Sequence, residues 1–127
     1  MTLPVYYTYV KNGKKTKMLI GLNIMYRLHC NERAKLEKWF ALHVKRNVNK
    51  VKIPGKYQVR YRYFYKNVLS DAPNVIAAVD KMFVDALQAE GVLEQDNVKY
   101  YVGCVWEVAE QDRNNPRVEA SIIKVSD

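Results

Sequence analysis

Alternating apolar and polar positions predict strands in two separate parts of the chain. Residues 5–10 are β-branched or aromatic, and the Asn12-Gly13 pair that follows favours a tight hairpin turn, with residues 16–20 as the returning strand. The alternation is most regular over residues 57–66, where odd positions hold Tyr or Val and even positions hold mainly Gln, Arg and Lys. This strand is predicted to pack its tyrosine face on a helix and to present a cationic row on its other face. Two later strands are expected at residues 98–108 and 117–125.

Apolar residues that recur at helical spacing predict two main helices. The first is expected at residues 31–48, with Asn31 as its N-cap, and the sequence leaves open whether it begins earlier, through residues 25–27. The second helix follows the segment 70–74, Ser-Asp-Ala-Pro-Asn, which is typical of a helix start, and it ends at Gly91. Its single apolar stripe consists of Val75, Val79, Met82, Phe83, Ala86 and Leu87.

The order of these elements, β-β-α-β-α-β-β, predicts the α+β class: a mixed β-sheet with two main helices packed on one face. With 127 residues the chain is expected to form a single domain, 1–127, because it is too short for two ordinary hydrophobic cores. No apolar run approaches the roughly 18 residues of a membrane-spanning helix, and the first residues lack the layout of a signal peptide. We therefore expect a cytoplasmic protein with no membrane partner, and buried free thiols at Cys30 and Cys104.

Charge is divided unevenly between the two halves of the chain, whose net charge is +8. Residues 1–70 hold sixteen Lys and Arg but only two acidic residues. Residues 71–127 hold five Lys and Arg and eleven acidic residues. A basic half predicts a polyanionic partner, most often nucleic acid, although two ordinary solvated surfaces of opposite charge would give the same counts. The cations expected to contact DNA belong to the hairpin and the regular strand: Lys14, Lys15, Lys17, Arg60, Arg62 and Lys66.

The remaining candidate chemistry lies in acidic residues around the second helix. The chain has no phosphate-binding glycine loop and no hydrolase nucleophile turn, and its two His and two Cys lack the spacing of a zinc site. Asp71 begins the second helix and Asp96 follows it, so the two carboxylates meet only if the loop folds back or Asp96 begins a strand antiparallel to that helix. Carboxylate oxygens bind magnesium, and a lysine such as Lys81 can neutralise charge on a phosphoryl oxygen. The structural alternatives are an N-cap for Asp71 and a surface ion pair between Lys81 and Asp85.

Five short motifs of the C-terminal half follow one another in a distinctive order. They are DAPN at residues 71–74, KMFVDAL at 81–87, GVLEQDN at 91–97, YVG at 101–103 and NPRVE at 115–119. Together they make the chain similar to the RusA family of Holliday-junction resolvases, above all to its phage and prophage branch from Gram-positive bacteria. The N-terminal half agrees with the family only through Leu22-Asn23 and its basic helix.

This resemblance implies a RusA-like fold and a magnesium-dependent, structure-selective endodeoxyribonuclease that resolves four-way DNA (Holliday) junctions in recombination and repair. It implies Mg²⁺ as cofactor, branched double-stranded DNA as substrate, and a homodimer, which suits a two-fold target. It also implies a phage or prophage protein that works in the cytoplasm of a bacterial host cell.

The resemblance also implies the roles of particular residues. It makes Asp71 and Asp96 metal ligands, Lys81 the catalytic lysine, and Asn74 the asparagine of the family's starting motif. One position departs from the family, because the second aspartate of its D-x-D motif falls on Pro73, whose side chain has no oxygen. The loss of a carboxylate is expected to weaken the metal site. The residues available to compensate are Asn74, Asp85 and Glu94.

Three hypotheses about function therefore remain open. The first is the RusA-like endonuclease described above. The second is a catalytically impaired RusA-like protein that binds branched DNA or a protein partner without cleaving, as Pro73 would explain. The third is a basic structural or RNA-binding protein whose tyrosine-rich strands stack on unpaired bases, although their period of two fits core packing equally well.

Overall fold

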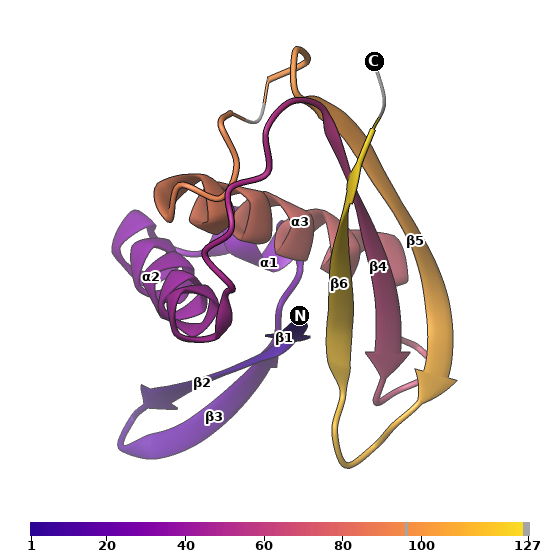
Figure 1. Cartoon of the computed structure of the whole chain (residues 1–127). Coiled ribbons are helices and arrows are strands. Elements are labelled where there is room, and N and C mark those ends of the chain that lie inside the picture. Colours follow the sequence, from indigo (N-terminus) through magenta and orange to yellow (C-terminus); the bar gives the residue numbers. More distant parts are fainter. Residues whose placement is uncertain (96, 126–127) are drawn as a thin grey trace.

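A four-stranded mixed β-sheet forms the frame of the protein (Figure 1). The structure, a computed structural model, describes residues 1–95 and 97–125. In sheet order the strands are β1 (Thr2–Pro4), β6 (Arg117–Lys124), β4 (Tyr57–Tyr65) and β5 (Tyr101–Gln111). Strands β4 and β5 are parallel, and the other neighbouring pairs are antiparallel. A separate antiparallel hairpin joins β2 (Tyr6–Lys11) to β3 (Lys14–Leu19) through the predicted Asn12-Gly13 turn, where both residues have positive φ.

Within the described residues, three helices lie on one side of this sheet (Figure 1): α1 (Leu22–Arg27), α2 (Cys30–Asn47) and α3 (Ala72–Ala89). Helix α3 connects β4 to β5, since parallel strands cannot be joined by a tight turn. Helix α2 packs against α3. The arrangement confirms the predicted α+β class, with two main helices beside a mixed sheet. No helix of the described ranges combines the length and the apolar character needed to cross a membrane.

The hydrophobic core lies between α3 and the tyrosine face of β4. Tyr57, Tyr61 and Tyr63 are at most 1% exposed, and the Tyr61 ring meets Phe83 of α3 with 6.2 Å between centroids. Burial of a large apolar side chain contributes roughly 2 kcal/mol to the free energy of folding. The predicted tyrosine face of β4 is therefore confirmed, whereas Phe64 departs from the prediction for the opposite face. Because these three rings are buried, they are not accessible to unpaired bases.

In the first helical region two predictions were wrong, the N-cap at Asn31 and the burial of Cys30, and the open question of an earlier helix start has an answer. Leu28 is extended (φ −69°, ψ 142°) and separates α1 from α2, so residues 22–27 form a helix of their own. Asn31 is not the N-cap of α2, because His29 precedes it and its Nδ1 accepts the Asn31 N–H at 3.2 Å. Cys30 is exposed, contrary to the prediction, since it lies in the first turn of α2 on its solvent side; Cys104 is partly buried.

The sheet differs from the prediction at three places. Residues 2–4 form β1, which pairs with β6 but is too short to show an alternation. Strand β5 begins at Tyr101 rather than residue 98, because the N–H groups of Tyr100 and Tyr101 donate to the Asn97 carbonyl in a turn. Phe64 was predicted on the polar face of β4, yet it is 7% exposed, because the guanidinium carbon of Arg117 lies 3.9 Å from its ring centroid.

Candidate functional site

The start of α3 carries the first predicted metal ligand. The Asp71 carboxylate is exposed, and its Oδ1 accepts the backbone N–H of Asn74 at 3.3 Å, which caps the helix. Pro73 lies in the first turn, where a missing N–H costs nothing. The Asn74 Oδ1 accepts the backbone N–H of Asn23 in α1 at 2.9 Å. Of the predicted starting motif, Asp71 therefore keeps one carboxylate oxygen that bonds to none of the residues the structure describes, whereas the Asn74 oxygen already links α3 to α1.

Gln95, the described residue before the second predicted ligand, lies at the other end of β4 from Asp71. Asp96 itself lies outside the described residues. The hydroxyl of Tyr57, the first residue of β4, donates to the Gln95 carbonyl at 2.9 Å. Near the opposite end of the strand, the Tyr63 hydroxyl and Ser70 Oγ are 2.7 Å apart, directly before Asp71. Tyr57 and Tyr63 are separated by about 20 Å of extended strand, so Asp71 and the described neighbour of Asp96 are not brought together in one protomer.

Lys81 and Asp85 lie on the exposed side of α3, where Lys81 Nζ is 3.9 Å from Asp85 Oδ2. With Arg33 and Glu37 of α2, which form a second pair at 3.9 Å, they line a groove of about 370 Å³ between the helices. The predicted ion pair is confirmed, and such exposed pairs contribute under about 1 kcal/mol. Lys81 lies ten residues after Asp71, about 15 Å along the helix axis. We call this hollow the helix groove.

The described residues offer few side chains that could bind magnesium. No group of three His, Cys, Asp or Glu side chains within residues 1–95 and 97–125 is arranged to hold a metal ion. Magnesium is often held by one or two carboxylates together with waters and substrate phosphates, and the exposed Asp71 carboxylate suits that role. Pro73 offers no ligand. Of the residues expected to compensate, Asn74 is bonded to Asn23, Asp85 pairs with Lys81, and Glu94 is exposed beyond α3.

Sequence reasoning missed a carboxylate on the sheet side of α3. Asp80 accepts hydrogen bonds from the hydroxyls of Tyr61 on β4 and Tyr101 on β5. Burial raises the pKa of both phenols, and the contact with Asp80 raises it further. Burial also raises the pKa of the Cys104 thiol, which makes this cysteine a poor nucleophile. The signal in the sequence was an acidic residue directly after buried Val79, opposite strands rich in tyrosine.

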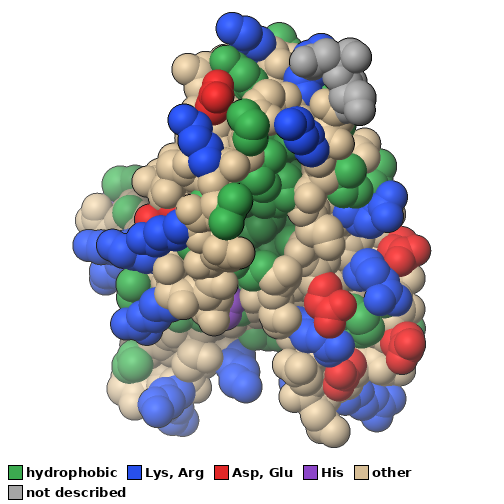
Figure 2. Space-filling view, viewed as in Figure 1, with side chains coloured by type: hydrophobic (Ala, Val, Ile, Leu, Met, Phe, Trp, Pro, Cys, Tyr) green, Lys and Arg blue, Asp and Glu red, His purple; other side chains and the backbone are tan. Residues whose placement is uncertain are grey.

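The cationic row on the outer face of β4 is partly neutralised. Arg62 Nε lies 2.9 Å from Glu107 Oε1 on β5, and Arg62 is also opposite Glu119 on β6. Arg60 is exposed between Val105 and Ser121. In Figure 2, red carboxylates are interspersed with blue cations over the strands at the right, whereas blue side chains prevail over α2 and the hairpin. The outer sheet face is thus a less favourable polyanion surface than predicted.

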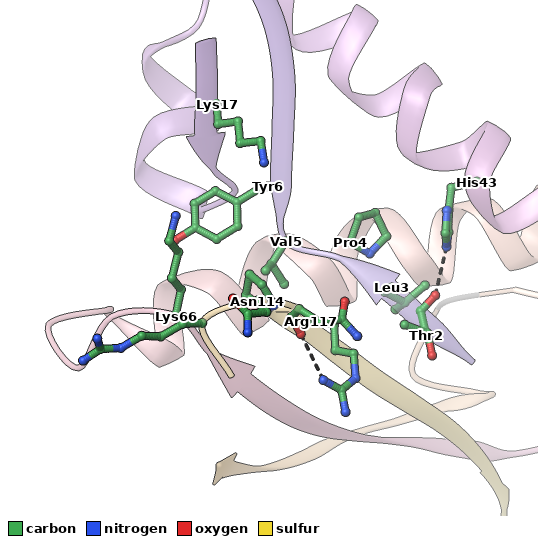
Figure 3. A pocket seen from close by; sticks show the side chains of 13 residues that line it. Thr2, Leu3, Pro4, Val5, Tyr6, Lys17, His43, Lys66, Asn114 and Arg117 are labelled. Carbon is green, nitrogen blue, oxygen red and sulfur yellow. Dashed lines mark hydrogen bonds between the residues drawn. The ribbon is translucent and has the colours of Figure 1, made fainter. Parts of the chain in front are cut away.

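The hairpin lysines and Lys66 form the more strongly cationic part of the surface. Lys14 lies directly opposite Lys11 in the hairpin register, an unfavourable pairing of like charges. Lys15 follows on the same exposed strand. Lys17 of β3 and Lys66, the residue directly after β4, face one cavity of about 340 Å³ (Figure 3). We call it the cationic cavity, because none of its lining residues is Asp or Glu.

Comparison with known proteins gave no further identification. A scan against protein-family models and a search of the curated proteins both found no match to the chain. The function therefore has to be proposed from the residues and their geometry.

Proposed function

We propose that the protein is a RusA-like, magnesium-dependent endodeoxyribonuclease that acts on four-way DNA junctions as a homodimer. The observation that carries the proposal is the short connection between β4 and α3. It bears Lys66, which faces the cationic cavity, at its start, and the exposed Asp71 carboxylate at its end. Five residues span at most about 18 Å, and the Ser70 N–H donates to the Asn67 carbonyl in a turn that shortens the connection. The exposed Asp71 carboxylate, which can bind magnesium, therefore lies on the same short connection as Lys66, which faces a cavity that can bind phosphate.

The chain's own residues would act mainly by position and charge. Lys17 and Lys66 attract the DNA backbone without reading its sequence, which fits recognition of junction shape. Asp71, and by the resemblance Asp96, would hold magnesium. When bound, the ion would supply charge neutralisation and an activated water. Lys81 has its catalytic role from the resemblance alone, because its amine pairs with Asp85 at 3.9 Å.

We infer that the two aspartates share an ion across the dimer, with one from each protomer. In one protomer Asp71 and Gln95 are associated with opposite ends of β4. A two-fold axis brings unlike parts of two identical chains together twice, so it creates two such sites.

A mixing experiment with two inactive variants tests this arrangement and the cleavage itself. Asp71→Asn and Asp96→Asn are each expected to abolish nicking of a labelled four-way junction but to spare binding. A shared site would regain up to about a quarter of wild-type activity when the variants are unfolded and refolded together, because half of the dimers are mixed and each has one intact site. No recovery would mean that the site lies within one protomer. Normal nicking by either variant alone would remove that residue from the site.

A second candidate function is junction binding without cleavage. It is favoured by Pro73, which removes one carboxylate, and by Asn74, whose side-chain oxygen is engaged with Asn23. A labelled four-way junction incubated with and without magnesium separates the two candidates. Cleavage supports the endonuclease, whereas retention without cleavage supports the binding protein. Gain of cleavage in Pro73→Asp would support loss of an ancestral activity, and tighter binding to single-stranded RNA would favour the RNA-binding hypothesis instead.

A further inference from the structure

Three cations from three separate segments face the cationic cavity without an acidic partner. Lys17 comes from β3, Lys66 follows β4, and Arg113 belongs to the connection between β5 and β6. No carboxylate of residues 1–95 and 97–125 forms an ion pair with any of them. Arg117, by contrast, lines the same cavity with its charge compensated, because it lies 2.9 Å from Asp112 and 3.2 Å from Glu119. The cavity therefore holds a local excess of positive charge.

The connection that carries Arg113 is held in a defined shape. The Asn115 N–H donates to the Asp112 carboxylate at 3.0 Å, and the Asn115 carbonyl accepts from Arg117 at 2.9 Å (Figure 3). Asn114 also lines the cavity and adds a neutral hydrogen-bond donor. The backbone that carries Arg113 thus belongs to a turn held by two hydrogen bonds.

Aromatic contact stabilises the cations in the cavity only in part. Figure 3 shows Lys17 and Lys66 reaching toward Tyr6 from the hairpin and from the segment after β4. Lys66 Nζ lies 5.6 Å from the Tyr6 ring centroid, an attraction that leaves the charge itself uncompensated. Like charges at such positions repel one another unless an anion lies between them. An anionic ligand is therefore the natural complement of this site.

The cationic cavity continues into a second hollow. A second hollow of about 450 Å³ shares Tyr6, Lys66 and Arg113 with the first and continues to Gln111. An open groove with cations along its length suits a chain of phosphates better than one small anion. We propose that the cationic cavity binds phosphate groups of a nucleic-acid backbone through Lys17, Lys66 and Arg113. This inference rests on the proposed function for the source of the phosphate, and it adds Arg113 and a specific location.

Neutral variants of the three cations test the site. Lys17→Gln, Lys66→Gln and Arg113→Gln each remove one charge, and Lys124→Gln is the matched control, an exposed lysine of β6 outside the cavity. Each cavity variant is expected to weaken junction binding about 5-fold to 10-fold at low salt and to lower the salt slope by about 1. Lys124→Gln is expected to change affinity less than about 2-fold. Equal losses in all four would overturn the site, and Lys17→Arg should retain binding if charge alone matters there.

Titration with inorganic phosphate separates this inference from the proposed function. In the wild type, the backbone amide signals of Arg113, Asn114 and Asn115 are expected to shift saturably, and Arg113→Gln should abolish the response. If the wild type binds no junction but gives this response, the proposed function fails and the cavity is assigned to free phosphate. A response to a poly-glutamate peptide but not to phosphate would assign it to an acidic protein partner and overturn the proposal, as would the absence of any response.

Discussion

Two hollows of similar size differ in how their charges are compensated. The cationic cavity has a volume of about 340 Å³ and the helix groove about 370 Å³. In the helix groove each cation meets a carboxylate of its own helix, Lys81 with Asp85 and Arg33 with Glu37. Such pairs attract little external charge, because most of their field cancels within a few Å.

The cationic cavity shows the opposite arrangement. Its cations come from segments far apart in the sequence, and the nearby carboxylates of Asp112 and Glu119 are both taken by Arg117. A count of Lys and Arg therefore does not locate a polyanion surface. What matters is which of these cations the fold leaves without an acidic neighbour.

Charge reversal in each hollow should give the largest difference between them. Arg113→Glu in the cavity is expected to weaken binding of a labelled four-way junction by about 100-fold at low salt, because a phosphate contact is replaced by repulsion. Arg33→Glu in the helix groove makes the same change in net charge, and less than about 3-fold weakening is expected. Fluorescence anisotropy at several salt concentrations measures both. Similar losses would mean that net charge alone determines the affinity.

Asp80 provides a third arrangement, in which two hydroxyls compensate a carboxylate. Asp80→Asn should destabilise the protein by about 1–3 kcal/mol, because one hydroxyl of Tyr61 or Tyr101 loses its acceptor. Urea unfolding followed by circular dichroism gives this free energy. The control is Asp85→Asn on the same helix, where a loss under about 1 kcal/mol is expected for an exposed pair. An equal loss in the two variants would contradict a structural role for the Asp80 contacts.

The same contacts predict how stability depends on pH. The pKa values of Tyr61 and Tyr101 are raised in the folded state, so the unfolded chain releases these protons first, above about pH 10. Their contribution to stability should be complete below about pH 10 and should decline as the pH rises further. Melting temperatures from about pH 8 to about pH 12 measure the decline. In Tyr101→Phe the decline of the melting temperature with pH should be shallower than in the control Tyr9→Phe. Identical slopes in the two variants would contradict a contribution of Tyr101 to the pH dependence.

The smallest effect is expected in the helix groove itself. Lys81→Gln removes an exposed i,i+4 pair with a 3.9 Å separation, so the free energy of unfolding should fall by less than about 0.5 kcal/mol. Junction binding should also be unchanged within about 2-fold. Chemical denaturation and anisotropy measure the two quantities. A large loss of affinity would place the helix groove, and not the cationic cavity alone, at the DNA.

Local patterns predicted much of the fold, because they record which face of an element is buried. The tyrosines at 57, 61 and 63 and the stripe from Val75 to Leu87 are buried as their spacing indicated. The short extended break at Leu28 carries no Gly or Pro signal, so the separation of α1 from α2 could not be predicted.

Contacts between distant segments could not be predicted from the sequence. The pair Arg62–Glu107 depends on the parallel register of β4 and β5. The cavity cations Lys17, Lys66 and Arg113 converge only because the hairpin, the end of β4 and the β5–β6 connection lie beside one another. The resemblance likewise implied a joint site for Asp71 and Lys81, although Lys81 lies ten residues after Asp71 along α3.

The contact between Gly21 and Asn74 has a consequence for how this fold can diverge. A side chain at position 21 would collide with the Asn74 amide, and relief would require that amide to swing away from the Asn23 N–H. Either residue should therefore change only in step with the other as related chains drift apart. An asparagine kept at position 74 in related chains would then reflect its hydrogen bond between α1 and α3, without implying a catalytic role.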